Sequence, residues 1–416
     1  MINEQPTTPG ERSVDEIRAH FPALNRIHNG FPVAYFDGPG GTQVPRGVVA
    51  AMTDYLFNHN ANSHWAYPTS SETDAIIAGA RAALADFLNA APSEIAFGQN
   101  MTSLTFHLAR ALGRDFKAGD ELIVTELDHH ANVDTWRSLE KERNVRIRVV
   151  PVDIESGTLE FGELENLLNA KTRLVAIGAA SNAIGTVSDV ARACALARAN
   201  GTMSFVDAVH FAAHESIDVQ AIGCDFLACS AYKFYGPHIG ILYGRQEMLE
   251  RIDFPKLKPA PDNAPERAET GTQSHESIAG AAAAVDFLAS LAAGETRRAR
   301  LENAYAAVHA RKMKLFTTLW NELGETRGVR LYGPPPAARR TPTLAFTIDG
   351  MPAQKVAEAL AARGLFASHG DFYAMTVVEK YGLAPAGLVR AGLACYTNFE
   401  EIARLIEAVR QLAGTT

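Results

Sequence analysis

Two stretches decide the fold class of this chain: MSFVDAVH at residues 203–210 and FLACSAYK at residues 226–233. Each begins with a short apolar run that is typical of a buried strand; the first run ends at Asp207 and the second leads into Lys233. In parallel α/β sheets, ligands bind beyond the carboxyl ends of the strands. We therefore expect Asp207 and Lys233 to emerge at the same, functional edge of a sheet, although such a pair could also be a buried ion pair.

Strand-like and helix-like segments alternate on both sides of these two stretches. Further strands are predicted at Ile95–Phe97, Leu122–Thr125, Arg146–Val150, Leu174–Ile177 and Ile239–Tyr243. Helices are predicted at residues 71–88, where apolar side chains repeat on one face, and at Asp189–Asn200, which Gly201 ends. Continuous apolar strands separated by helices imply a mostly parallel sheet that is buried on both faces. The fold class that we predict is therefore α/β.

The C-terminal part of the chain shows a different pattern. A proline-rich loop at Pro255–Pro265 precedes long helical patterns at Ile278–Leu291 and Arg297–Leu323, and a compact α+β stretch follows. We therefore expect three parts. They are an N-terminal arm at residues 1–30 that packs with the small domain, a large domain at residues 31–280, and a small C-terminal domain at residues 281–416.

Composition and charge exclude several classes of function. The 416 residues include 39 Lys and Arg against 47 Asp and Glu, a net charge of −8, so nucleic acid and anionic membranes are not expected partners. No apolar run approaches the ~18 residues that a membrane span needs. Met1–Arg12 is polar and lacks the apolar segment of a secretory signal, and the four cysteines form no CxxC pair. The expected compartment is the cytosol, where the cysteines stay reduced thiols.

Motifs of several other catalytic classes are missing. Asp37–Gly41 is rich in glycine, but no GxGxxG or GxxxxGK[ST] is present, so we expect either a turn or a loop that passes close to a ligand. His129 and His130 are adjacent, and as strand neighbours they would point to opposite faces, which does not make a metal clamp. No GxSxG elbow is present either. The sequence therefore predicts no metal site and no serine hydrolase.

A series of motifs carries a more specific signal. In chain order they are YFDGPGGTQVP at residues 35–45, ELDHHANVDTW at 126–136, ASNAIG at 180–185, SAYK at 230–233, GPHIG at 236–240 and YTNFEE at 396–401. Together, over nearly the whole chain, they resemble the pyridoxal-phosphate (PLP) enzymes of fold type I, class V aminotransferases, nearest to the cysteine desulfurase-like and isopenicillin N epimerase-like branch. The resemblance implies a large PLP-binding domain, with a mostly parallel sheet flanked by helices, and a smaller α+β C-terminal domain.

The resemblance assigns catalytic roles to Lys233 and His129 and a cofactor-binding role to Asp207. Lys233 would hold PLP as an internal aldimine, and burial favours this because it lowers the pKa of a lysine amine. Asp207 would keep the pyridine nitrogen protonated, which makes the ring an electron sink. His129 would stack on the face of the ring, although a plain core histidine is the alternative.

The resemblance also implies the other cofactor contacts. Asn182 and His210 would lie at the edge of the ring, with His210 in place of the glutamine that is usual in desulfurases. An imidazole can still donate a hydrogen bond there, although its charge depends on pH. The phosphate would be held by a helix N-terminus and by hydroxyl groups. These contacts are Met101, Thr102, Ser230 and Tyr232, the last in place of a common histidine.

Two residues would complete the site. Thr272 matches a threonine that reaches the phosphate from the neighbouring subunit, so the resemblance implies a homodimer. Arg390 matches the arginine that binds the substrate's α-carboxylate, a task that suits its planar fork. An ordinary strand-end salt bridge is the alternative for Arg390.

The sequence departs from the desulfurases at the residue that accepts sulfur. Aligning GDFYAM at residues 370–375 on the loop that carries their thiol puts Tyr373 at the cysteine's position, and a phenol cannot take sulfur as a thiolate does. None of the four cysteines is placed to replace it: Cys194, Cys224, Cys229 and Cys395. We therefore do not expect a persulfide. Tyr373 is either a wall of the pocket or an acid near the leaving group.

The expected function is that of a PLP-dependent enzyme acting on an α-amino acid. External aldimine and quinonoid intermediates would lead to a C–S β-lyase reaction without a persulfide cysteine. A class V aminotransferase or an amino-acid epimerase is the alternative, because the same intermediate leads to all three outcomes. A catalytically silent scaffold relative is the second alternative, since the thiol is missing and His210 and Tyr232 depart from the pattern.

Overall fold

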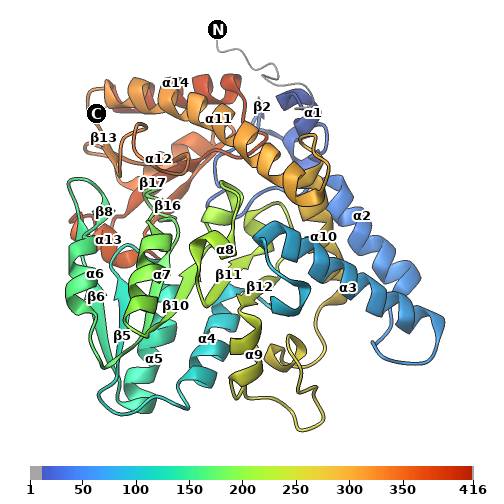
Figure 1. The fold of residues 1–416 in the computed structure, drawn as a ribbon. Coiled ribbons are helices and arrows are strands. Elements are labelled where there is room, and N and C mark those ends of the chain that lie inside the picture. Colours follow the sequence, from blue (N-terminus) through green and yellow to red (C-terminus); the bar gives the residue numbers. More distant parts are fainter. Residues whose placement is uncertain (1–11, 415–416) are drawn as a thin grey trace.

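The computed structural model describes residues 12–414, and its centre is a seven-stranded sheet (Figure 1). The strand order is β4-β12-β11-β10-β9-β5-β6. The strands are β4 (Ile95–Gly98), β5 (Glu121–Thr125), β6 (Arg146–Val150), β9 (Thr172–Gly178), β10 (Met203–Asp207), β11 (Phe226–Ser230) and β12 (Gly240–Gly244). From β11 to β6 all pairs are parallel, whereas β12 is antiparallel to both of its neighbours. The prediction of an α/β fold with a mostly parallel sheet is confirmed.

The reversal of β12 follows from the length of its connection to β11. Residues 231–239 join the two strands, and a parallel return would need a crossover of about a dozen residues or more. The chain therefore turns back directly beside β11. This short turn carries Lys233, which is thereby kept at the carboxyl end of β11.

Helices cover both faces of the sheet (Figure 1). One face packs against α3 (Pro68–Leu88), α7 (Val190–Ala199) and α10 (His275–Ala289), and the other against α4 (Met101–Leu112), α5 (Asp134–Arg143) and α9 (Gln246–Arg251). Along β9, Val175 and Ile177 belong to the first apolar cluster, while Leu174 and Ala176 belong to the second. The sheet is thus buried on both faces, as its continuous apolar strands predict. Among residues 12–414, no helix is both long and apolar enough to cross a membrane.

A second, smaller sheet lies in the C-terminal part of the chain. Its order is β13-β14-β17-β16 and all its pairs are antiparallel. The elements are α11 (Arg297–Gly324), β13 (Val329–Tyr332), β14 (Thr343–Ile348), α12 (Ala353–Ala361), β15 (Leu365–Phe366), β16 (Ser368–Gly370), α13 (Met375–Lys380), β17 (Leu388–Gly392) and α14 (Phe399–Ala413). Helices α11, α12 and α14 form a separate apolar core with this sheet. The boundaries at residues 30 and 280 stay predictions.

The N-terminal part of the chain contacts this smaller unit. β3 (Ala34–Tyr35) pairs in parallel with β15, and Arg18 Nη1 donates to the Tyr396 carbonyl at 2.6 Å and to Glu401 Oε1 at 2.9 Å. Residues 1–11 of the expected arm lie outside the described residues. The remaining elements before the large sheet are α1 (Val14–Arg18), β1 (Ile27–His28), β2 (Phe31–Pro32) and α2 (Arg46–Asp54).

A buried guanidinium joins the two units near the end of β9. Arg340 is 1% exposed, and its Nη2 donates to the Ile184 carbonyl at 3.1 Å while its Nε donates to the Thr341 carbonyl at 3.2 Å. The rings of Phe316 and Trp320 lie over it at 4.3 and 4.8 Å. These contacts hold the loop that follows β9 against the small domain.

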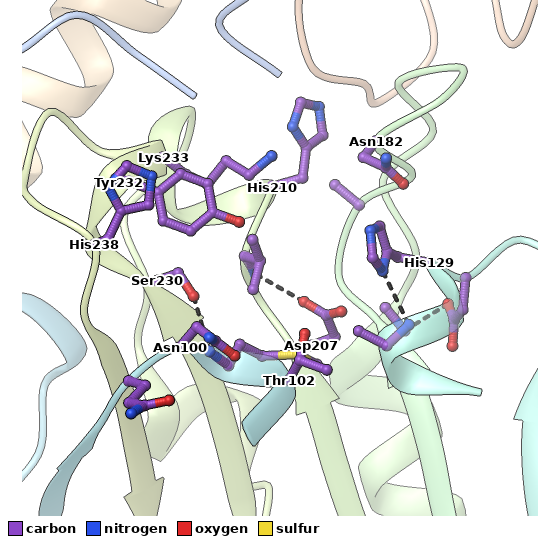
Figure 2. Close-up of a pocket in the computed structure, with 17 residues that line it drawn as sticks. Asn100, Thr102, His129, Asn182, Asp207, His210, Ser230, Tyr232, Lys233 and His238 are labelled. Carbon is purple, nitrogen blue, oxygen red and sulfur yellow. Dashed lines mark hydrogen bonds between the residues drawn. The ribbon is translucent and has the colours of Figure 1, made fainter. Parts of the chain in front are cut away.

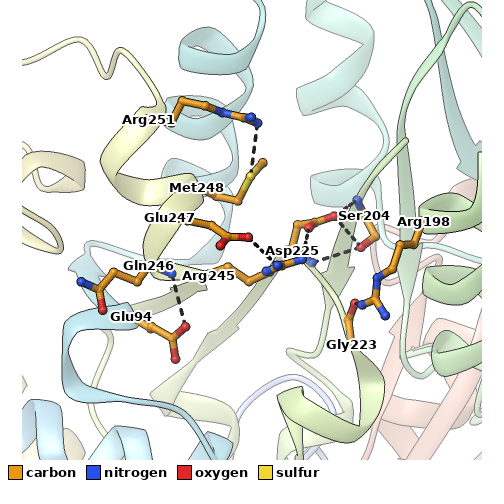
Figure 3. Close-up of polar contacts among 10 residues, drawn as sticks. All are labelled: Glu94, Arg198, Ser204, Gly223, Asp225, Arg245, Gln246, Glu247, Met248 and Arg251. Atoms are coloured by element: carbon orange, nitrogen blue, oxygen red, sulfur yellow. Dashed lines mark hydrogen bonds and ion pairs between the residues drawn. The ribbon is translucent and has the colours of Figure 1, made fainter. Parts of the chain in front are cut away.

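At the opposite end of the sheet, Asp225 ties three strands together (Figure 3). Its Oδ2 accepts hydrogen bonds from the Ser204 backbone at 2.8 Å and from the Ser204 hydroxyl at 3.1 Å, which links β10 to β11. Its Oδ1 lies 3.3 Å from Arg245 Nη1, just beyond β12. The carboxylate therefore holds the N-terminal ends of β10 and β11 in register with β12.

Replacing Asp225 with alanine is expected to lower the free energy of unfolding by about 1–3 kcal/mol, because the Ser204 donors lose a charged acceptor in a largely buried place. Equilibrium urea unfolding measures this loss. The matched control is Glu247→Ala, which removes the exposed partner of Arg245 and should cost less than about 0.5 kcal/mol. Equal losses in the two variants would contradict the assigned role of Asp225.

Candidate active site

A cavity of about 500 Å³ opens at the carboxyl ends of the parallel strands (Figure 2). It lies where parallel α/β sheets bind their ligands. Every residue that the sequence predicts to bind the cofactor lines it, apart from Thr272. These lining residues are Met101, Thr102, His129, Asn182, Asp207, His210, Ser230, Tyr232 and Lys233.

Lys233 presents a buried amine to this cavity. It ends a short 3-10 turn after β11 and is 9% exposed, and its Nζ donates to the carbonyl of Pro39. Burial, assisted by the charge of Arg390 and opposed by Asp207, lowers the pKa of Lys233 to about 7. A large fraction of the amine is therefore neutral near pH 7, which is the form that attacks a carbonyl carbon.

Asp207 places a carboxylate at the end of β10, on the floor of the same cavity (Figure 2). It is 8% exposed, and its Oδ1 accepts a hydrogen bond from the Val209 backbone at 2.9 Å. Burial raises the pKa of Asp207 to about 6, although the Val209 donor and the charge of Lys233 oppose the rise. Asp207 could hold a protonated nitrogen of a ligand, whose positive charge would stabilise the carboxylate.

The N-terminus of α4 forms another side of the cavity. Asn100 caps the helix by accepting the Ser103 backbone N–H at 2.9 Å, and the Met101 backbone N–H donates to the Ser230 hydroxyl at 3.0 Å. Thr102 follows in the first turn of this helix. A helix N-terminus with hydroxyl groups beside it suits an anion such as a phosphate. A side chain at Gly240 would not fit here, since its Cβ would come within 2.4 Å of the Asn100 backbone.

Arg390 and Asn182 form a polar pair beside the cavity. Arg390 lies on β17, is 4% exposed, and its Nη1 donates to the Asn182 carbonyl at 2.8 Å. One buried side-chain atom of each residue has no hydrogen-bond partner among residues 12–414: Arg390 Nε and Asn182 Oδ1. Burial lowers the pKa of Arg390 to about 9, with Asp37 opposing the change. A buried guanidinium with a free N–H is poised to receive a carboxylate.

These groups match the chemistry of pyridoxal phosphate. A largely neutral lysine amine suits its aldehyde, a buried carboxylate suits its ring nitrogen, and a helix N-terminus suits its phosphate. The free polar atoms of Asn182 and Arg390 lie beside that set and remain for a substrate. The residues present therefore fit this cofactor.

Residues 34–405 match the aminotransferase class-V family, which is most of the chain. The chain belongs to this family. The cofactor is pyridoxal phosphate and the protein is a PLP-dependent enzyme. The resemblance and the cofactor that the sequence motifs predict are thereby confirmed.

Relatives and solved structures place this class V enzyme with the cysteine desulfurases. It is 32% identical to a cysteine desulfurase of Pectobacterium carotovorum, over 96% of this chain and 98% of that protein. It is also 32% identical to one of Synechococcus elongatus, over 96% of this chain but only 63% of that protein. The apo structure of a cysteine desulfurase from Thermococcus onnurineus NA1 matches with a TM-score of 0.87 and 25% identity, covering 100% of both chains.

The structure places one further residue at the site, Asp128, which the sequence analysis missed. Asp128 lines the cavity, and its carboxylate accepts hydrogen bonds from the Gly178 backbone at 2.8 Å and from Asn132 Nδ2 at 2.9 Å. Burial, with Asp207 nearby, raises the pKa of Asp128 to about 8. Asp128 thus anchors the turn that carries His129. The sequence signal that could have found Asp128 is its position three residues after the end of β5, at the edge of the sheet where ligands bind.

The expectation that His129 and His130 are strand neighbours is wrong. They follow β5 in a turn, where His129 caps a 3-10 turn at His130–Asn132. The His129 Nδ1 accepts the Ala131 N–H at 2.9 Å, whereas His130 Nδ1 lies 2.9 Å from Asp134 Oδ2. Burial and the charge of Lys233 lower the pKa of His129 to about 4, so its ring is neutral. β5 ends at Thr125, so both histidines lie beyond the strand.

His210 contacts residues distant in sequence, whereas Tyr232 contacts a residue close to it along the chain. The Nε2 of His210 lies 3.1 Å from the Thr341 hydroxyl and 3.0 Å from the Thr343 hydroxyl. Burial lowers the pKa of His210 well below its usual value, and Lys233 adds to this. The ring of Tyr232 stacks on His238, which sequence reasoning missed, with centroids 4.8 Å apart. Their closeness along the chain, beyond β11, could have indicated this pair.

Three residues that the sequence analysis places at the site are not part of the cavity lining: Arg390, Thr272 and Tyr373. Arg390 reaches the site through Asn182, as described above, and Thr272 lines two other cavities with Gln273. Asp37–Gly41 runs beside the site, since Pro39 accepts the hydrogen bond from Lys233. From the sequence, this stretch is expected to be either a turn or a loop close to a ligand, and the structure shows a loop at the site.

Proposed function

We propose that this class V enzyme cleaves the bond between the β-carbon and sulfur of an S-substituted α-amino acid, without a persulfide on the protein. One observation carries the proposal: all four cysteines are unpaired and buried. They are Cys194, Cys224, Cys229 and Cys395. Burial raises the pKa of every one of these thiols, and an inert, inaccessible thiol cannot receive sulfur from a substrate.

Tyr373 occupies the exposed position where a sulfur acceptor is expected. Its side chain is 73% exposed, and its ring stacks on His129 with centroids 5.5 Å apart and an angle of 25°. The sulfur of the substrate therefore has no accessible cysteine thiol among residues 12–414 to receive it. It leaves instead as a thiol.

The residues of the site support this reaction as follows. The bound cofactor supplies an electron sink for the carbanion at the α-carbon. Arg390 binds the α-carboxylate through its free Nε–H, which orients the reacting bonds. The neutral amine of Lys233 accepts the proton from the α-carbon. Breakage of the C–S bond releases the thiol and 2-aminoacrylate, which water converts to pyruvate and ammonia, so atoms and charge balance.

The test is a search for sulfur on the protein. Wild-type holoenzyme incubated with L-cysteine or S-methyl-L-cysteine should release sulfide or methanethiol together with pyruvate, and intact-protein mass spectrometry after alkylation should find no added sulfur atom. Tyr373→Cys should gain a persulfide from L-cysteine, because it restores a thiol at an exposed place. Tyr373→Ser is the matched control.

Persulfide on any native cysteine would contradict the proposal. A new amino acid formed from a 2-oxo acid, or a D-isomer, would instead support the aminotransferase or epimerase alternative. Both products are measured in the same reaction mixtures by chiral chromatography.

The proposed setting is a homodimer in the cytosol. Thr272 is exposed in the loop before α10, and we infer that it reaches the phosphate site of the partner subunit. Large apolar side chains are exposed on α2, on the segment that follows it and on the loop before Thr272, as is usual for an interface between subunits. They are Val49, Leu56, Phe57, Trp65, Tyr67 and Leu257.

A further inference from the structure

A strained turn lies beside the site, in contact with Asn182 and His129. Phe372 and Tyr373 have φ angles of +59° and +57°, the left-handed region that residues other than glycine seldom adopt. Each such residue carries a cost in free energy and persists only where its surroundings over-determine it. Two consecutive residues with positive φ beside the site indicate that the surrounding structure holds this turn in a specific conformation.

Large-domain groups hold the backbone of this turn. The Phe372 carbonyl accepts a hydrogen bond from Asn182 Nδ2 at 2.8 Å, and the Tyr373 carbonyl accepts one from the His130 N–H at 2.6 Å. Within the turn, the Tyr373 N–H donates to Asp371 Oδ1 at 2.9 Å. Both strained residues therefore use their carbonyl groups to attach the small domain to the edge of the large one.

The two side chains lie on two residues of the proposed site. The ring of Phe372 is 4.0 Å from the guanidinium carbon of Arg390, which covers one face of that group and keeps water from it. The ring of Tyr373 stacks on His129. The covered guanidinium can then offer a ligand only its edge, where Nε is free.

The neighbours of the two rings limit where a substrate side chain can lie. Tyr373 borders the cavity because its ring stacks on His129, which lines it. Arg390 borders the same cavity through its bond to Asn182, so the side chain of an amino acid held at Arg390 lies in the space that Tyr373 borders. The Tyr373 ring is 73% exposed, so it offers an uncovered aromatic surface with open space beyond it. A large apolar group can contact that ring and still extend outward.

We propose that Phe372 and Tyr373 determine the specificity of the site, selecting cysteine S-conjugates whose sulfur carries an aromatic or apolar group. Phe372 positions the edge of Arg390 for the carboxylate, and Tyr373 provides the surface on which the sulfur substituent lies. This inference rests on the proposed C–S lyase function and names its substrate class. The hydroxyl of Tyr373 has no part in it, which makes Tyr373 a wall of the pocket.

The test measures binding separately from turnover. The probes are S-phenyl-2-methyl-L-cysteine and S,2-dimethyl-L-cysteine, which lack the α-hydrogen and therefore bind without elimination. Titration calorimetry on the holoenzyme should show the S-phenyl probe binding about fivefold more tightly than the S-methyl probe, the range expected for one aromatic contact. Tyr373→Ala and Tyr373→Leu should remove this preference, and Tyr373→Phe should keep it.

Phe372→Leu should act differently, because it alters the carboxylate end of the site. Both probes should bind about fivefold more weakly, with the ratio between them unchanged. Equal binding of the probes by the wild type, or a preference that survives in both Tyr373→Ala and Tyr373→Leu, would overturn the inference. If the wild type prefers the S-phenyl probe but releases no thiol from S-phenyl-L-cysteine, the proposed reaction is contradicted. The proposed role of Tyr373 in binding the sulfur substituent would still stand.

Discussion

Lys233→Ala is expected to abolish turnover and to remove the visible absorption of the holoenzyme, roughly 400–430 nm for a cofactor joined to lysine. The variant loses both the amine that attaches the cofactor and the base that takes the α-proton, so the rate should fall by about 10⁴-fold or more. The measurements are an absorption spectrum after reconstitution with PLP and a product assay with S-methyl-L-cysteine. Lys355→Ala is the matched control, since that lysine is exposed on α12.

Burial lowers the pKa of Lys233 to about 7, so the neutral fraction of the free amine should grow as the pH rises through that value and then level off. The rate at which the apoprotein takes up PLP, measured at different pH values, should follow the same course. A wild type that takes up no PLP, or a Lys233→Ala variant that keeps full activity, would refute the assigned role. The control should show the wild-type spectrum and rate.

The sheet could be predicted from the sequence because buried parallel strands are continuous apolar runs. The reversed direction of β12 could not, because an apolar run reads the same in either direction. Its direction is decided by the length of the connection at residues 231–239, and that requires both strand ends to be known. The end of β5 at Thr125 was predicted correctly, and His129 and His130 lie beyond it in a 3-10 turn whose shape depends on local hydrogen bonds.

The candidate site was predictable where the residues follow strand ends or motifs. Asp207 and Lys233 satisfy that condition, and both line one cavity. The contact of Arg390 with Asn182 could not be predicted, because it joins parts of the chain far apart in sequence. The roles of residues that act through such contacts can be recognised only in the three-dimensional structure, where the two domains are packed together.

Arg390→Met is expected to lower kcat/KM for S-methyl-L-cysteine by about 10²–10³-fold, mainly through KM, because a substrate carboxylate then loses a buried charged partner worth roughly 2–5 kcal/mol. Arg390→Lys should restore little of the loss, since an ammonium group lacks the planar fork. The measurement is initial-rate kinetics with S-methyl-L-cysteine over a wide concentration range. Thermal unfolding of each variant is measured alongside.

The Tm of Arg390→Met distinguishes binding of the substrate carboxylate from the role of an ordinary salt bridge. Arg390 has a buried Nε without a partner and no carboxylate within 4.0 Å among residues 12–414, so replacing its charge with an apolar chain should leave the Tm unchanged or higher. Ligands without a carboxylate, such as S-phenylcysteamine, should bind the wild type and the variant equally. A large fall in Tm, or equal loss of binding for both ligand types, would show that Arg390 serves the fold and that the carboxylate is held elsewhere.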